Sequence, residues 1–196
     1  LSEWIALPFS EFRVPPPSKV TVPFEIAIPS DIASGGYYAA ITVSQSPSDV
    51  VADNGALIEA KVAVLILLTV EGDTIEKLEL LDFAGADGLM DRLSGTFTFR
   101  LQNQGNVHLA PEGKLKVIDL FDRTISEIDV NPEQSRVLPA STRTYAVGRE
   151  SAGGFIAVLK EQASVFAIGP MKARFELRYG DSRQMIRAQS SFWYVP

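Results

Sequence analysis

The sequence contains no cysteine and only a single histidine. The absence of cysteine excludes disulfides, thiolate metal sites and cysteine nucleophiles. A Ser-His-Asp triad would have to use His108, with Ser94 and Asp91 as its nearest sequence neighbours, but no G-x-S-x-G motif is present. Because His108 lies beside a predicted turn at 103–106, we interpret it as a surface or capping residue. We therefore predict a protein that is not an enzyme and that binds no metal and no cofactor.

An excess of basic residues is also lacking. Residues 1–74 hold 3 Lys and Arg against 9 Asp and Glu, which accounts for the whole net charge of -6. Residues 75–196 hold 15 residues of each sign and are neutral overall. Because a nucleic-acid-binding protein should present a basic face, we expect no nucleic-acid partner.

No apolar run reaches the length of about 18 residues that a membrane helix needs. The longest run, Val62–Val70, is rich in Val, Ile and Leu and is typical of a buried strand. The sequence starts at Leu1, without the charged and apolar segments of a signal peptide. We therefore expect that a leader has been removed or that the chain is part of a longer protein.

The dominant pattern that is present has a period of two residues, which predicts β-strands. In the first part of the chain, Lys19–Ile28 alternates, with Pro23 indicating an edge strand or a bulge. Tyr37–Ser44 and Leu57–Val70 are the next predicted strands, separated by a polar loop, Gln45–Gly55. Glu71-Gly72-Asp73 then breaks the pattern, and we place a domain boundary there.

The second part of the chain shows about seven alternating segments separated by turn signals, the number that one complete sandwich needs. These predicted strands are Lys77–Phe83, Gly95–Leu101, Lys114–Phe121, Thr124–Val130, Thr142–Val147, Lys172–Tyr179 and Met185–Val195, and Ala157–Val165 is ambiguous between a helix and a strand. The sequence therefore predicts an all-β chain of two tandem immunoglobulin-like antiparallel sandwiches, at 1–74 and 75–196. Because the first supplies only about four strands, we expect it to be incomplete at its N-terminus, with its early strands upstream of Leu1 or missing.

A basic surface is predicted on the last two strands and the turn between them, where an acidic polymer or partner could bind. The alternative is a solvated strand face with ion pairs to Glu176. Trp4, Tyr37 and Tyr38 are further aromatic candidates, although most aromatics of alternating strands are expected in the core. The candidate binding residues are Arg174, Arg178, Arg183, Arg187 and Trp193, with Lys172 beside them.

Two other features leave alternatives open. Asp82, Asp87 and Asp91 lie close together in the sequence, in and next to a predicted loop at 84–91, and their spacing does not match an EF-hand. A solvated loop is the favoured interpretation, and a calcium ion there is the alternative. Val62–Val70 is apolar on both faces, although one face of a sandwich strand should meet solvent. The second face is therefore expected to be covered by the second domain, a neighbouring chain or an added strand.

Strand alternation, a proline that ends a strand and glycine turns together carry a family resemblance. The segments that show it are Val22–Pro29, Gly35–Ile41, Phe99–Leu109, Val137–Pro139 and Tyr179-Gly180. They resemble the tandem immunoglobulin-like domains of bacterial cell-surface proteins, in particular the WxL-interacting protein family. The resemblance implies an exported, extracellular protein that is tethered by a membrane segment outside this chain and that binds peptidoglycan and partner proteins at the wall. No ligand-contacting motif of the family is matched.

The sequence therefore favours a non-catalytic cell-surface binding or scaffold module that contacts cell-wall polymer or surface proteins. One alternative is a structural subunit of an extracellular homo- or hetero-oligomer that packs through Val62–Val70. Another is a periplasmic chaperone-like protein, since such proteins also have two domains in about 200 residues.

Overall fold

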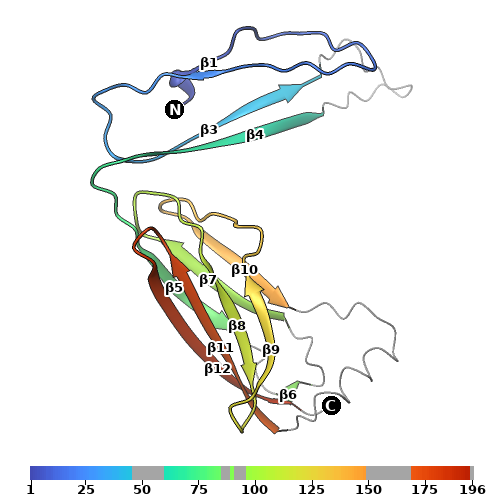
Figure 1. The fold of residues 1–196 in the computed structure, drawn as a ribbon, viewed down its shortest axis with the longest axis vertical. Helices are drawn as coiled ribbons and strands as arrows, with labels where there is room; N and C mark the ends of the chain where they lie inside the picture. The colour runs from blue at the N-terminus through green and yellow to red at the C-terminus, as the bar shows by residue number, and fades with distance from the viewer. Residues whose placement is uncertain (46–59, 85–88, 91–95, 149–168, 195–196) are drawn as a thin grey trace. The chain divides into compact units, whose positions relative to one another are not determined.

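The structure is a computed structural model that describes residues 1–45, 60–84, 89–90, 96–148 and 169–194 (Figure 1). Within these residues, the regular structure is all-β apart from one 3-10 turn, η1, at Ser2–Trp4. The prediction of an all-β chain with antiparallel sheets is confirmed. The chain divides into two compact units, Leu1–Thr74 (unit 1) and Ile75–Pro196 (unit 2).

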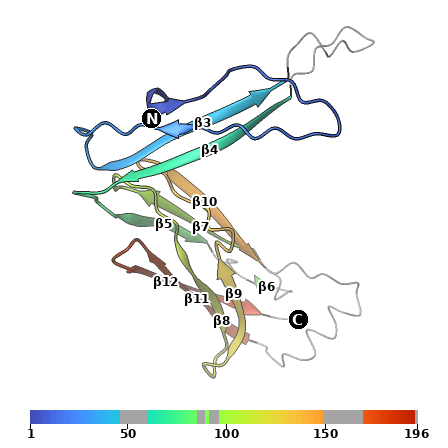
Figure 2. The same ribbon diagram turned by 45° about the horizontal axis from the view of Figure 1, so that its top comes forward.

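The described residues of unit 1 form two small antiparallel sheets of two strands each. The short strands β1 (Ile5–Ala6) and β2 (Glu25–Ile26) pair with one another. The long strands β3 (Gly35–Ser44) and β4 (Lys61–Val70) pair along their whole length, from Gly35 opposite Val70 to Ser44 opposite Lys61. In Figures 1 and 2, the segment that precedes β3 runs alongside this β3–β4 ribbon. The rings of Trp4 and Tyr37, whose centroids are 4.8 Å apart, join the two parts.

The predicted strand at Lys19–Ile28 is wrong, because only Glu25–Ile26 is a strand there. Val20, Phe24 and Ile28, which alternation placed on the inner face, are 42 %, 44 % and 49 % exposed. Pro23 cannot donate a ladder hydrogen bond, and the described part of unit 1 offers no layer against which this face could be buried. The strand predicted over Leu57–Val70 begins at Lys61 in the described chain, and 57–59 lie outside the described residues. The predicted loop at Gln45–Gly55 lies outside them from residue 46 onward.

Unit 1 has no apolar core within its described residues. Gly35 is the one residue of this part that is buried, and every buried hydrophobic side chain of the described chain belongs to unit 2. A two-stranded ribbon is at best marginally stable in water without further strands or a packed layer. The β3–β4 ribbon therefore needs additional contacts to be stable.

Unit 2 contains eight described strands in two sheets. The smaller sheet has the order β10-β7-β5, and the larger has the order β6-β12-β11-β8-β9. All neighbours are antiparallel except β6 and β12, which are parallel. The strands are β5 (Leu78–Ala84), β6 (Leu89–Met90), β7 (Thr96–Asn103), β8 (Glu112–Ile118), β9 (Thr124–Val130), β10 (Thr142–Gly148), β11 (Gly169–Tyr179) and β12 (Gln184–Tyr194).

The two sheets pack face to face through aromatic side chains, which makes unit 2 a β-sandwich. Phe175 of the larger sheet contacts Phe99 and Phe83 of the smaller one, with ring centroids 4.5 and 5.3 Å apart. Phe97 and Phe192 make a further contact between the sheets at 6.0 Å. Alternation along β11 buries Ala173, Phe175, Leu177 and Tyr179, as the sequence predicts. The core of the described chain thus lies between these two sheets.

Two predictions for unit 2 need correction, and a third falls outside the described chain. The loop predicted over 84–91 contains β6, whose two residues Leu89 and Met90 pair with Trp193 and Tyr194. The strand predicted to end at Phe121 ends at Ile118, because the chain turns there into the β8–β9 hairpin. The ambiguous segment 157–165 lies outside the described residues.

Candidate functional site

The larger sheet of unit 2 presents a charged side to solvent, which we call the outer face. Because Ala173, Phe175 and Leu177 point into the core, the alternate residues of β11 point outward. Register then aligns the outward residues of the neighbouring strands. Glu176 lies opposite Arg187 on one side and Lys114 on the other, and Arg174 lies opposite Gln189 and Lys116. The outward positions of β11 are Lys172, Arg174, Glu176 and Arg178.

The outer face of β11 and β12 carries an excess of positive charge. Its cations are Lys172, Arg174, Arg178 and Arg187, and its one carboxylate is that of Glu176. The Nε of Arg187 lies 3.2 Å from a carboxylate oxygen of Glu176, which is the ion pair that the alternative interpretation predicts. This is therefore a solvated strand face. Its β11–β12 part has an excess of positive charge, and β8 and β9 add two cations, Lys114 and Lys116, and three carboxylates, Glu112, Glu127 and Asp129.

The cations of the outer face differ in their partners. Arg174 lies 3.8 Å from the exposed carboxylate of Asp122, a loose contact with little expected effect on stability. In the described part of the chain, no ion pair joins Lys172 or Arg178 to a carboxylate, although Glu112 lies opposite Arg178 in the register. Lys114 and Lys116 on β8 both pair with Glu127 on β9. Two cations of the outer face are thus available to an anionic ligand without breaking an ion pair.

Trp193 lies on the same outer face, near the end of β12, and is 57 % exposed. It is directly opposite Pro170, and the next outward pair along the two strands is Ser191 with Lys172. Diagonal neighbours of this kind are about 7–8 Å apart, within reach of long and aromatic side chains. The flanking aromatics Phe192 and Tyr194 are 3 % and 1 % exposed and belong to the core. Trp193 is therefore an exposed ring that a ligand can stack on beside the Lys172 ammonium.

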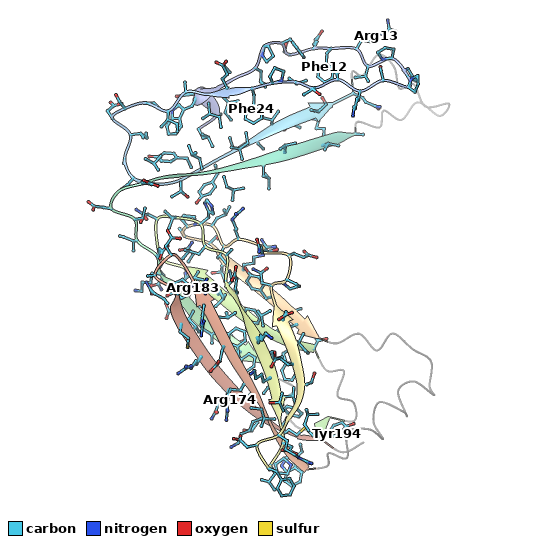
Figure 3. All side chains as sticks on the ribbon, viewed as in Figure 1. Phe12, Arg13, Phe24, Arg174, Arg183 and Tyr194 are labelled. Carbon is cyan, nitrogen blue, oxygen red and sulfur yellow. The ribbon has the colours of Figure 1, made fainter. Side chains whose placement is uncertain are left out.

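Arg183 does not join these residues. It lies in the β11–β12 turn with a φ of 49°, and its amide donates to the carbonyl of Gly180. The Glu76 carboxylate holds this turn by accepting hydrogen bonds from the amide of Asp181 and the hydroxyl of Ser182. From Arg183 to Trp193 the strand extends about 30 Å. Figure 3 shows Arg183 at the turn and Arg174 farther along β11, so the predicted residues follow the length of the hairpin and do not form one cluster.

The tip of the β8–β9 hairpin is a feature that sequence reasoning missed. Leu120 and Phe121 are 71 % and 75 % exposed, and the Arg123 guanidinium lies 5.4 Å from the Phe121 ring centroid. Register places this tip at the Trp193 end of the sheet, because Lys172 pairs with both Ile118 and Ser191. The two apolar residues directly before Asp122-Arg123 are the signal in the sequence, since a hairpin turn is usually polar.

Asp119 shapes this hairpin tip. One carboxylate oxygen accepts hydrogen bonds from the amides of Phe121 and Arg123, at 3.0 and 2.8 Å, and the other is bound by the Arg123 guanidinium. Desolvation pulls the pKa of Asp119 upward, but the hydrogen bonds and charge of Arg123 and the Phe121 amide hold the pKa below its usual value. Asp119 therefore stays ionised near neutral pH and fixes the Arg123 guanidinium against Phe121.

Of the residues that sequence analysis considered for catalysis or metal binding, the structure describes only His108 and Asp82. His108 is half-buried between Val107 and Leu109, and desolvation together with the Arg136 charge lowers its pKa. Ser94 and Asp91, the candidate triad partners, lie outside the described residues, as does Asp87. Asp82 lies in β5 opposite Arg100 and not in a loop. Among the residues that the structure describes, no group of three His, Cys, Asp or Glu could hold a metal ion.

The described part of the chain contains no helix that is long and apolar enough to cross a membrane. No protein-family model matches the chain, and no curated protein matches it. A solved structure of a Porphyromonas gingivalis W83 protein of unknown function is similar at 15 % identity and a TM-score of 0.36, covering 98 % of this chain and 81 % of that one. The solved structure of the YadV chaperone is similar at 10 % identity and a TM-score of 0.33, covering 87 % of this chain and 69 % of that one. Neither likeness is close enough to bear on the function of this chain.

Proposed function

We propose that the chain is a non-catalytic binding module of an exported cell-surface protein, and that the outer face of unit 2 binds an anionic cell-wall polymer such as peptidoglycan. The observation that carries the proposal is the excess of positive charge on the β11–β12 part of this face. Four cations accompany one carboxylate on β11 and β12, beside the exposed ring of Trp193. Arginine binds carboxylate and phosphate groups in a bidentate manner, and exposed aromatic rings give apolar contact area for a sugar ring.

The arrangement suits an extended ligand better than a compact one. The outward positions of β11 recur about every 7 Å along the strand, and cations occupy 172, 174 and 178. The exposed rings of Trp193 and Phe121 lie at one end of this row, and Arg183 lies about 30 Å away at the other. A repeating anionic polymer that lies along the hairpin can therefore contact several cations at once.

We also propose that unit 2 is an immunoglobulin-like domain. The order of its strands supports this assignment. In such domains the first, second and fifth strands share one sheet, and the third, sixth and seventh share the other. Here β5, β7 and β10 form one sheet, and β8, β11 and β12 belong to the other, with β9 added at the edge as in variable-type domains.

A second candidate function is that of a structural subunit in an extracellular assembly. It is favoured by unit 1, where apolar side chains of β4 are exposed and no described hydrophobic side chain is buried. The periplasmic chaperone-like role stays a prediction.

Co-sedimentation of the full chain with insoluble peptidoglycan tests the proposed function. The Arg174→Ala/Arg178→Ala variant is expected to bind at least about tenfold more weakly, because hydrogen bonds to charged groups contribute about 1.5–3 kcal/mol each. Binding should also weaken as salt increases. Arg100→Ala/Arg143→Ala makes the same change of charge on exposed positions of the smaller sheet and should bind like the wild type. Binding that is absent, or that is equally sensitive to both double variants, would contradict the proposal.

A further inference from the structure

The free edge of β4 lacks the features that normally protect an edge strand. Within the described chain, β4 pairs only with β3, so its other edge has no strand partner. Exposed edges are usually protected by charged side chains, prolines or bulges. From Val62 to Val70, β4 contains none of these protective residues, and its pairing with β3 runs without a bulge. Such an edge is a template for a further strand.

The side chains of β4 are also exposed to an unusual degree. Val62, Val64 and Leu65 are 68 %, 56 % and 72 % exposed. Because side chains alternate along a strand, Val62 and Val64 lie on one face of the ribbon and Leu65 on the other. Contiguous exposed apolar surface on a soluble protein marks an interaction site. A further strand beside β4 and a second layer packed on the sheet would therefore bury apolar side chains on both faces of β4.

The charges that flank β4 indicate which strand fits this edge. Lys61 begins the strand and Glu71 follows its last residue, and the residues between them are uncharged. An antiparallel copy of the same strand reverses this order, so it brings a negative end beside a positive one. In a register centred on Ile66, Lys61 lies opposite Glu71 of the second copy, and the reciprocal pair forms at the other end.

This register places opposite charges across from one another at both ends of the paired strands. A two-fold axis perpendicular to the sheet leaves the side chains of each copy on the face of the sheet where they already lie. Each residue must therefore lie opposite a residue whose side chain points to the same face, so the register can be centred only on a residue. Centring on Leu65 places Lys61 opposite Thr69, so the pair with Glu71 is lost. Centring on Leu67 places Glu71 opposite Ala63. It places Lys61 opposite Asp73, which lies beyond the end of β4 in the second copy. The register centred on Ile66 places apolar side chains opposite one another at most positions between the charges.

We propose that unit 1 pairs β4 with β4 of a second copy of this chain, antiparallel and centred on Ile66, to form a four-stranded sheet in the order β3-β4-β4-β3. Four strands with an apolar face meet the size at which a sheet becomes stable, which a two-stranded ribbon does not. The pairing involves unit 1 alone and is independent of the ligand proposed for unit 2.

Charge reversal measured by sedimentation velocity tests the pairing. The full chain should sediment as a dimer. Lys61→Glu and Glu71→Lys should each weaken the dimer at least tenfold, because the symmetry creates two like-charge pairs in each variant. The double variant Lys61→Glu/Glu71→Lys should dimerise again, which excludes misfolding as the cause of the loss. Lys19→Glu and Asp31→Lys make the same charge changes at exposed positions of unit 1 outside β4, and should remain dimeric.

Cysteine cross-linking tests the register, because the chain has no cysteine of its own. Opposite residues of an antiparallel pair have Cα atoms about 4.5–5.5 Å apart, within the range for a disulfide. Ile66→Cys should therefore give a covalent dimer under mild oxidation. Val62→Cys should not, since the two copies of this residue would be about 27 Å apart. A monomeric chain, a double variant that fails to dimerise, or cross-linking at Val62 in place of Ile66 would each overturn the proposal.

Discussion

Phe175→Ala is expected to destabilise unit 2 by about 3–5 kcal/mol. Phe175 is fully buried, and its ring contacts Phe99 of β7 and Phe83 of β5 across the sandwich. Truncation would leave a cavity between the two sheets, where strands fixed by ladder hydrogen bonds on both sides cannot collapse to fill it. Because domains of this size have a free energy of unfolding of about 5–15 kcal/mol, the loss is a large fraction of the total.

Urea unfolding followed by circular dichroism measures this effect, with Phe121→Ala as the matched control. Phe121 is 75 % exposed, so its truncation should change the free energy of unfolding by no more than about 0.5 kcal/mol. A change below about 1 kcal/mol for Phe175→Ala would mean that the two sheets do not pack through this ring.

Gly113→Ala is expected to destabilise unit 2 by about 3 kcal/mol or more, at the upper end of overpacking effects. An added Cβ at this position in β8 would lie 2.0 Å from the carbonyl oxygen of Glu176 and 2.9 Å from the Cα of Leu177. Both atoms belong to the backbone of β11, which cannot rotate away as a side chain can. The substitution therefore has to separate β8 from β11 in the middle of the larger sheet.

The same urea measurement tests this prediction, with Lys114→Ala as the control at the next residue. Lys114 is exposed on the outer face, and its one carboxylate partner, Glu127, also binds Lys116. Its truncation should therefore cost less than about 1 kcal/mol. Equal stability of Gly113→Ala and the wild type would show that β8 and β11 are farther apart than the described register requires.

Alternation predicted the strands of unit 2 well, because two packed sheets bury one side of each strand. Phe97, Phe99 and Leu101 on β7 and Phe175 and Leu177 on β11 follow this rule without exception. The same rule failed at Lys19–Ile28, where no described layer buries the apolar side. Alternation reports that a face is apolar, and it does not report whether a partner for that face exists.

The candidate site was only partly predictable for a similar reason. The alternation of side chains along β11 places Arg174 and Arg178 on one outward face, as the sequence predicts. The exposure of Trp193 depends on which of three adjacent aromatics points outward, and the strand end at Ile118 decides that Phe121 is exposed. Strand ends and turn geometry are set by tertiary packing, so the hairpin tip could not be placed from its residues alone.

The fluorescence of Trp193 tests the proposed polymer site most directly. The chain has two tryptophans, so Trp4→Phe leaves Trp193 as the single reporter and keeps a ring against Tyr37. On titration with soluble peptidoglycan fragments, the proposal predicts a saturable blue shift, as the exposed indole loses contact with water. The shift should require higher ligand concentrations in the Arg174→Ala/Arg178→Ala background. An emission spectrum that does not change at any fragment concentration would contradict binding at the outer face of unit 2.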